Sequence, residues 1–367
     1  MGTVLKVILY ALLMVFVFGI LIFIHELGHF MTARRFGVTI KEFAIGMGPT
    51  LFSRTSKKYG TKYALRLLPI GGFVSMVGED EASEDENAFC NKKVWKRMII
   101  IIAGATMNLL LGFLLIMILV LAQPQIGSNV YAGTIDNSKI ETLKKEYPEM
   151  FAEYDFEAFP LQRGDKIVSV DGTMVFTYND VSYELMNKGY EPIEVVVKRN
   201  NEKIPLTVTL PVQVDQASGT KFGYTGFMTF FEEEKNVVNV IKQTAFRSVS
   251  SVKMVYDSII GLISGRFGME AISGPIGVAE TVGDAAKSGV LNFIYIVAIL
   301  TINLGVINLI PFPALDGGRF LLLIVEGIRR KPLNRKLESY INFAGIVVLF
   351  AFMIFISFKD IIKLIFR

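Results

Sequence analysis

The stretch VILYALLMVFVFGILIFIHELGHF, Val7 to Phe30, joins 18 residues without a charge (Val7 to Ile24) to two histidines and a glutamate. These are the only two histidines in the chain. A hydrocarbon core takes about 20 apolar residues of helix, so the run predicts a membrane-spanning helix. Ionisable groups are costly at that depth and usually mark function. The stretch therefore predicts a membrane protein with a functional site at the end of its first span.

Three further uncharged runs support this fold class: Met98 to Ala122, Ser288 to Leu315 and Ser339 to Phe358, of 25, 28 and 20 residues. One such run could be a buried core helix, but four predict a polytopic α-helical membrane protein with four transmembrane helices. The first run could also be a signal peptide. Only Lys6 precedes it as a basic residue and no small-residue cleavage site follows, so we expect a retained anchor.

The distribution of positive charge predicts the orientation of the spans. Residues 34–97 carry 12 Lys and Arg, and residues 319–336 carry six. Connections rich in Lys and Arg usually stay in the cytoplasm, so the N-terminus, the long segment between spans two and three and the C-terminus are expected outside. The basic C-terminal tail argues weakly the other way. The net charge of +4 suggests no nucleic-acid partner, and a single cysteine, Cys90, excludes an internal disulfide.

The stretch TKYALRLLPIGGFVSMVG (61–78) alternates and then turns at Pro69 to Gly72, which predicts a β-hairpin. It is too apolar for a solvated loop, so we expect it to fold back into the membrane.

The full division of the chain is expected as follows: a first transmembrane helix with the histidine motif (1–36), the cytoplasmic or re-entrant hairpin region (37–97), a second transmembrane helix (98–122), an extracytoplasmic domain (123–215), an amphipathic linker (216–287), a third transmembrane segment (288–318), a cytoplasmic loop (319–338), a fourth transmembrane helix (339–358) and a tail (359–367).

The domain at 123–215 resembles a PDZ domain of α+β class. Its PLQRGDKIVSVDGTMV (160–175) gives a turn, a strand and a tight Asp171-Gly172 turn; a short helix and a strand hairpin around Asn200-Asn201 follow. PDZ domains bind an extended chain terminus by strand addition, so a peptide ligand is expected. The insertion KIETLKKEYPEMFAEYDFEAF (139–159) leaves the position of a carboxylate-binding loop open. The alternative is a β-domain that only spaces the spans.

The histidine motif has the spacing of a zinc site. His25 and His29 are four residues apart, so on a helix they face the same way, and two imidazoles can hold one Zn²⁺. Glu26 lies about 100° round the helix, where it can reach a metal-bound water as general base. The alternative is a pair of helix histidines that hydrogen-bond to neighbouring spans.

A catalytic zinc needs a third protein ligand, and with no other histidine a carboxylate is expected. Asp316 lies in NLIPFPALDGGR (308–319) at the end of span three. Spans one and three run in the same direction, so Asp316 and the histidines are expected to meet near the cytoplasmic leaflet. Glu42 and Glu79 are alternative third ligands, but both lie in a loop, where span direction does not predict that they meet the histidines.

Two prolines, Pro311 and Pro313, are expected to break span three just before Asp316. Such breaks free backbone carbonyls, which is tolerated where protein or water lines the gap. Asn308 lies about one helical turn before Pro311 and could donate hydrogen bonds to a substrate carbonyl or oxyanion. Gly71 and Gly72 of the apolar hairpin would allow close approach of a substrate backbone.

Taken together, these motifs resemble the site-2 protease family of intramembrane zinc metalloproteases, in its bacterial RseP/RasP type with a single PDZ domain. The resemblance covers nearly the whole chain and rests on the following motifs: HELGH (25–29), IGMGP (45–49), RLLPIGGFV (66–74), SGPIGV (273–278) and NLIPFPALDGG (308–318). It implies one Zn²⁺ on His25, His29 and Asp316, with Glu26 as the base and Asn308 holding substrate. It also implies a membrane-re-entrant β-element around Gly71 and Gly72.

We therefore expect regulated intramembrane proteolysis at the plasma membrane of a bacterial cell, with the active site near the cytoplasmic leaflet. The resemblance implies single-pass substrates, such as anti-sigma factors or signal-peptide remnants, with the PDZ region restricting access. Two other classes remain open. A metal transporter would need more ligands along several spans, and a PDZ-bearing scaffold without activity would lack one of the four site residues. A zinc protease of soluble substrates is disfavoured by the position of the motif at a span end.

Overall fold

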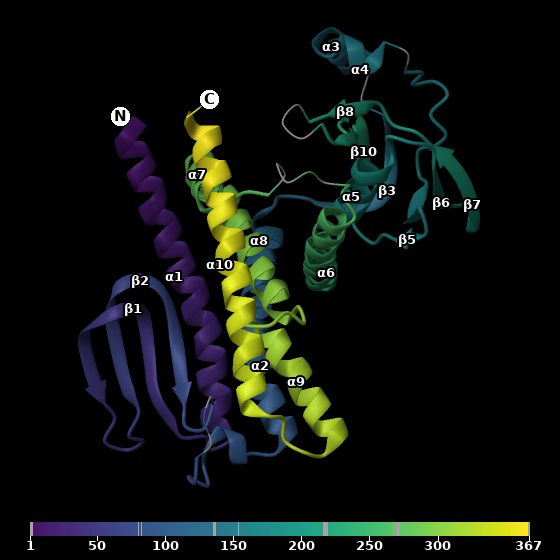
Figure 1. The fold of residues 1–367 in the computed structure, drawn as a ribbon. Helices are drawn as coiled ribbons and strands as arrows, with labels where there is room; N and C mark the ends of the chain where they lie inside the picture. Colours follow the sequence, from purple (N-terminus) through teal and green to yellow (C-terminus); the bar gives the residue numbers. More distant parts are fainter. Residues whose placement is uncertain are drawn as a thin grey trace. The chain divides into compact units, whose positions relative to one another are not determined.

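The computed structural model describes residues 3–365 except 80, 82, 135–136, 153, 216–218, 267 and 269–271. The chain forms two compact units, one of Met1–Leu115 with Ser273–Arg367 and one of Ile116–Ile272 (Figure 1). Each is described by itself below as unit 1 and unit 2. Part of the acidic stretch 78–89 and the end of the C-terminal tail lie outside the described residues.

Four helices of the described residues are long and apolar enough to cross a membrane. They are α1 (Thr3–Arg35), α2 (Val94–Ala122), α8 (Val290–Leu309) and α10 (Arg335–Ile365). The four-span prediction agrees with these helices, and the chain is a polytopic membrane protein. The C-terminal tail expected from residue 359 continues α10 to Ile365.

The segment expected as a cytoplasmic loop is mostly helical, because α9 runs over Asp316–Arg329. Its Glu326 accepts two hydrogen bonds from Arg97 of α2, at 2.5 and 3.2 Å. Leu323 is buried among residues of α1, α2 and the hairpin region. The charges at the ends of this segment predicted its side of the membrane, but its apolar middle forms a packed helix.

The apolar stretch 61–78 is not a self-contained hairpin, which corrects that prediction. Residues Lys62–Met76 form one bent strand, β2, paired antiparallel with β1 (Ile40–Thr55). The first half of β1 lies between the two halves of β2, because Glu42 pairs with both Lys62 and Ser75. Both strands lie beside α1 (Figure 1). The turn at Gly71 therefore brings the end of β2 to the outer side of β1.

The motif SGPIGV opens α7 (Pro275–Ser288), which packs on α1, α8 and α10. The Gly277 amide donates a 3.0 Å hydrogen bond to the buried carboxylate of Asp360 in α10. A helix N-terminus favours negative charge, so Asp360 is stabilised where it would otherwise be a costly buried group. Near the other end of α7, Asp284 accepts a 2.6 Å hydrogen bond from Tyr10 of α1.

Unit 2 is built on an antiparallel sheet with the strand order β10-β3-β4-β6-β7, in which β5 pairs with β4. The strands and helices of this unit are β3 (Ile126–Thr134), α3 (Asn137–Glu146), α4 (Pro148–Phe151), β4 (Lys166–Val170), β5 (Thr173–Met174), α5 (Tyr178–Lys188), β6 (Ile193–Arg199), β7 (Glu202–Val208), β8 (Val212–Val214), β9 (Lys221–Gly223), β10 (Met228–Glu233) and α6 (Val237–Ile263). Two tight turns predicted from the sequence are confirmed, since Asp171-Gly172 and Asn200-Asn201 both have positive φ between paired strands. The insertion forms α3 and α4, and its aromatic side chains pack on the core.

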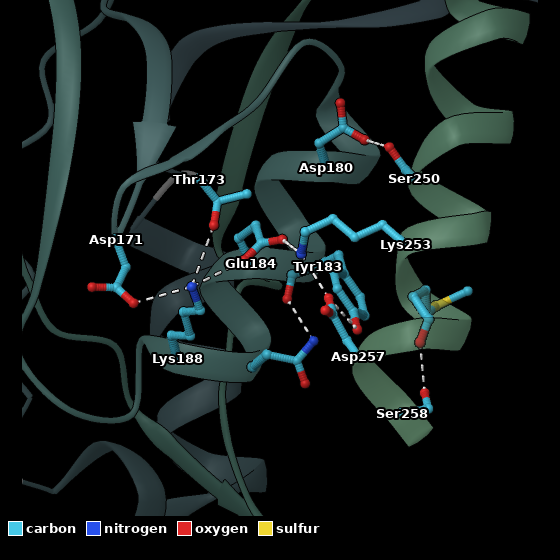
Figure 2. A network of polar contacts seen from close by, with 12 residues as sticks. Asp171, Thr173, Asp180, Tyr183, Glu184, Lys188, Ser250, Lys253, Asp257 and Ser258 are labelled. Atoms are coloured by element: carbon cyan, nitrogen blue, oxygen red, sulfur yellow. Dashed lines mark hydrogen bonds and ion pairs between the residues drawn. The ribbon is translucent and has the colours of Figure 1, made fainter. Parts of the chain in front are cut away.

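The segment expected as a linker, 216–287, contains structured elements of both units. Strand β10 pairs with β3 at one edge of the sheet of unit 2, and α6 packs on α5. Figure 2 shows the contact between these helices: Lys253 of α6 lies 2.5 Å from the buried carboxylate of Glu184, and Ser250 hydrogen-bonds to Asp180. Phe246 of α6 stacks on Phe176 at 4.2 Å between ring centroids. Polar residues of α6, in the segment expected as a linker, thus contact α5 of the domain that precedes it in the chain.

Candidate metal centre

The two histidines converge on one point inside unit 1. Both lie in α1, one helical turn apart, and both are buried. Their Nε2 atoms are 3.2 Å from each other. The spacing of four residues therefore has the consequence expected from the sequence, since both rings present the same nitrogen to the same space.

Asp316 completes the cluster from a distant part of the chain. It is the first residue of α9, and its Oδ2 lies 3.2 Å from Nε2 of His25 and 3.3 Å from Nε2 of His29. The three potential ligand atoms lie within 4.8 Å of one another. The two other candidate carboxylates are engaged elsewhere: Glu42 pairs with Arg66 at 2.8 Å and Glu79 with Arg319 at 2.5 Å. Of the three carboxylates considered, the one at the end of span three faces the histidines.

The space between these atoms fits a metal ion. A Cβ placed on Gly104 of α2 would lie 2.8 Å from Nε2 of His25 and closer still to Nε2 of His29. The position facing the two nitrogens is thus kept free of side chain. Two imidazoles and one carboxylate are the donor set of a catalytic zinc site that leaves its fourth position open. The residues present therefore fit zinc.

The ring of His29 is held by the backbone of α2. Its Nδ1 lies 2.8 Å from the carbonyl oxygen of Ile100. A carbonyl only accepts, so this contact places the proton on Nδ1 and leaves the Nε2 lone pair for the metal. The sequence did not point to Ile100, because a backbone acceptor has no residue signature.

Glu26 lies beside the cluster and close to the end of β2. A Cβ on Gly72 would lie 3.5 Å from Cγ of Glu26 and 2.9 Å from the carbonyl oxygen of Ala44. The close approach to the carbonyl oxygen of Ala44 requires a glycine at position 72, while the distance to Glu26 is an ordinary van der Waals contact. The neighbouring Gly71 has φ of 83°, which turns the strand. The structure thus brings Gly72, one of the two predicted glycines, close to the proposed base.

The prolines lie in the connection between α8 and α9. Helix α8 ends at Leu309, one residue after Asn308, and α9 begins at Asp316. Pro311 and Pro313 therefore lie outside regular helix, as the sequence predicted. Ala314 has φ of 74°, unusual for a residue with a side chain, and its amide donates to Oδ1 of Asn342 in α10 at 3.3 Å. This strained turn sets the position of Asp316.

Comparisons with known proteins agree with this centre. The sequence profile of a family described as peptidase family M50 matches residues 13–352. The chain is 29% identical over 432 residues to the regulator of sigma-W protease RasP of Bacillus subtilis, covering 95% of this chain and 97% of that protein. It is 30% identical over 426 residues to the zinc metalloprotease RasP of Geobacillus kaustophilus, covering 95% and 96%. A zinc metalloprotease RasP of Bacillus licheniformis is 29% identical over 434 residues, with 95% and 98% covered.

Proposed function

Because the chain belongs to peptidase family M50 and is a zinc metalloprotease of the site-2 protease type, we propose that it cleaves single-pass membrane proteins within the bilayer. The observation that carries the proposal is the meeting of His25, His29 and Asp316 at the end of an apolar span. Such a position suits a peptide bond that lies at membrane depth. The transporter and scaffold alternatives are not favoured.

In this proposal His25, His29 and Asp316 hold one zinc ion and Glu26 is the general base. Zinc, when bound there, polarises the scissile carbonyl and lowers the pKa of a water molecule. Glu26 takes the proton from the attacking water and gives it to the leaving amine. Asn308, in the last turn of α8, donates a hydrogen bond to a carbonyl of the substrate. The turn with Pro311 and Pro313 opens room for the unwound substrate backbone.

The substrate must present an extended backbone, because a helix hides its peptide bonds in its own hydrogen bonds. Residues 72–75 of β2 pair on one side with β1, and among the described residues no strand pairs with their other edge. This edge lies close to Glu26 at Gly72. We expect an extended substrate segment to add to it by strand pairing. The apolar β1–β2 element would then be the membrane-re-entrant part of the enzyme.

Unit 2 is proposed to be a PDZ-like domain outside the cytoplasm. Support comes from the sheet, from helix α5 packed on it, and from the two tight turns. Its role would be to bind a peptide or to restrict access to the membrane site. Substrates of the anti-sigma factor or signal-peptide class are proposed on the likeness to RasP of Bacillus subtilis, whose name describes a regulator of sigma-W. The proposed location is the bacterial cell membrane, with the N-terminus outside.

The test is zinc content and cleavage of a tagged single-pass segment by the full chain in liposomes. Glu26→Gln is expected to keep zinc and to lose cleavage by at least about 100-fold. Asp316→Asn is expected to weaken both zinc binding and cleavage. Glu234→Gln, an exposed residue of unit 2, is the matched control and should behave as wild type. Undiminished cleavage by Glu26→Gln would overturn the mechanism.

A further inference from the structure

Helix α2 supplies no metal ligand, but one stripe of it faces the metal centre. Ile100, Gly104 and Asn108 are each four residues apart, so they lie on the same face of the helix. Ile100 contacts the ring of His29 and Gly104 faces both Nε2 atoms. Asn108 continues the stripe, with Nδ2 3.3 Å from Nδ1 of His25. The three residues therefore contact the two histidine ligands from one side.

Asn108 is fully buried at membrane depth, where a polar side chain is costly. Its Oδ1 has no hydrogen-bond partner among the described residues. Its backbone carbonyl accepts a 3.2 Å hydrogen bond from Thr301 of α8, which fixes the backbone and not the amide group. The contact with His25 alone therefore decides which end of the amide faces the ring.

The chemistry of zinc binding determines that choice. A histidine that binds zinc through Nε2 is neutral and carries its proton on Nδ1. An Nδ1–H group needs an acceptor, and His29 has one in the carbonyl of Ile100. The side chain at Nδ1 of His25 is Asn108, and only its oxygen end can accept.

We infer that Asn108 is a positioning residue of the metal centre, which turns its Oδ1 to His25 and holds the Nδ1–H form that binds zinc. This inference rests on the proposed ligand set of His25, His29 and Asp316. It gives the second span a defined part in the chemistry: a backbone acceptor for one histidine, a side-chain acceptor for the other and a glycine between them. Loss of such an outer partner typically weakens metal binding about 10- to 100-fold.

The test compares zinc affinity of the purified full chain by competition with a chelator, and the visible spectrum of the Co²⁺ form. Asn108→Leu keeps the shape of the side chain and removes the acceptor; we expect zinc binding about 10- to 100-fold weaker and a changed Co²⁺ spectrum. Asn108→Asp keeps an acceptor and cannot donate when ionised, so we expect zinc binding equal to or tighter than wild type. Thr301→Val, which removes the neighbouring buried hydrogen bond, is the control and should leave both readouts unchanged.

Two results would overturn the inference: wild-type affinity and spectrum in a folded Asn108→Leu, or equal loss in Asn108→Leu and Asn108→Asp. If the Leu variant does not fold, Asn108→Asp decides, because an amide that donates to His25 predicts loss and an accepting one predicts retention. A His25→Gln variant distinguishes failure of the proposed ligand set from failure of the role proposed for Asn108. Should His25→Gln bind zinc normally, the ligand set itself is wrong; should it lose zinc while Asn108→Leu does not, only the role of Asn108 is wrong.

Discussion

Gly104 has no side chain, and the metal centre needs that absence because any Cβ there would enter the space between the two Nε2 atoms. We predict that Gly104→Ala abolishes stoichiometric zinc binding while the chain still folds, since alanine favours helix more than glycine does. Elemental analysis of the purified protein gives the zinc-to-protein ratio. Gly327→Ala in α9, where the nearest atom to a new Cβ would be 3.6 Å away, is the matched control. A full zinc complement in Gly104→Ala would show that the ion lies elsewhere.

Asp165 is the residue that should make unit 2 sensitive to acid. Burial alone would raise the pKa of its carboxyl, but Arg199 contacts both oxygens at 2.7 Å and the Gln162 amide donates to Oδ2 at 2.8 Å, so the pKa lies below its ordinary value. A lowered folded pKa contributes stability above the unfolded pKa of about 4, which is lost as the pH falls through the folded value. We predict a fall in unfolding temperature below about pH 4 that is smaller in Asp165→Asn than in wild type. Equal pH profiles in thermal melts would contradict this.

At the level of elements, the contact between α5 and α6 depends on the ion pairs of Lys253. Burial alone would lower the pKa of Lys253, but Asp257 and Glu184 at 2.6 and 2.5 Å raise it, so the side chain is charged at neutral pH. In Lys253→Met the buried carboxylate of Glu184 would keep the ion pair with Lys188, at 3.5 Å, and lose the one with Lys253. We expect hydrogen exchange in α6 to become about 2- to 10-fold faster. Lys253→Arg keeps the charge and should stay near wild type; unchanged exchange in Lys253→Met would mean that the ion pairs of Lys253 do not hold α6 in place.

The elements that the sequence predicted well are those determined by local signals. Long uncharged runs predicted the four spans, and Asp171-Gly172 and Asn200-Asn201 predicted their turns, because left-handed backbone favours these residues. The bent strand β2 was missed, since its halves pair with the preceding strand β1 rather than with each other. Helix α9 was missed because the topology argument used its charged ends and not its apolar middle, Phe320 to Val325.

The candidate site could likewise be predicted only where its residues form a recognisable sequence pattern. His25, Glu26, His29 and Asp316 carry a spacing and a topology that can be read from one sequence. Gly104 and Asn108 cannot be read in this way, because a glycine and an asparagine in a span are ordinary until the packing shows what they face. Which face of α2 turns to α1 is a property of tertiary structure. The proposed ligands could thus be selected from the sequence, whereas the residues proposed to orient them required the structure.

At the scale of the whole molecule, the connections between spans determine on which side of the membrane the chemistry lies. In unit 1 the start of α1 and the end of α10 lie at the same end of the helices, as Figure 1 shows. The connection between α1 and α2 holds β1, β2 and the single cysteine, and it is rich in Lys and Arg. If this connection is cytoplasmic, the end of α1 that carries His25 and His29 is near the cytoplasmic leaflet. Unit 2 follows α2 and would then be outside.

The single cysteine allows the side of the connection between α1 and α2 to be measured in the unmodified chain. Cys90 lies in the short helix η1 (Phe89–Asn91) before α2 and is partly exposed. We predict that a membrane-impermeant maleimide labels Cys90 in inverted vesicles and not in intact cells, because the basic connection is retained inside. Lys203→Cys in a Cys90→Ser background places the thiol on the exposed strand β7 of unit 2 and should show the reverse pattern, with Cys90→Ser alone as the blank. Labelling of Cys90 from outside would invert the topology and place the proposed zinc site near the outer leaflet, so the same measurement determines from which side water and cleaved products reach the site.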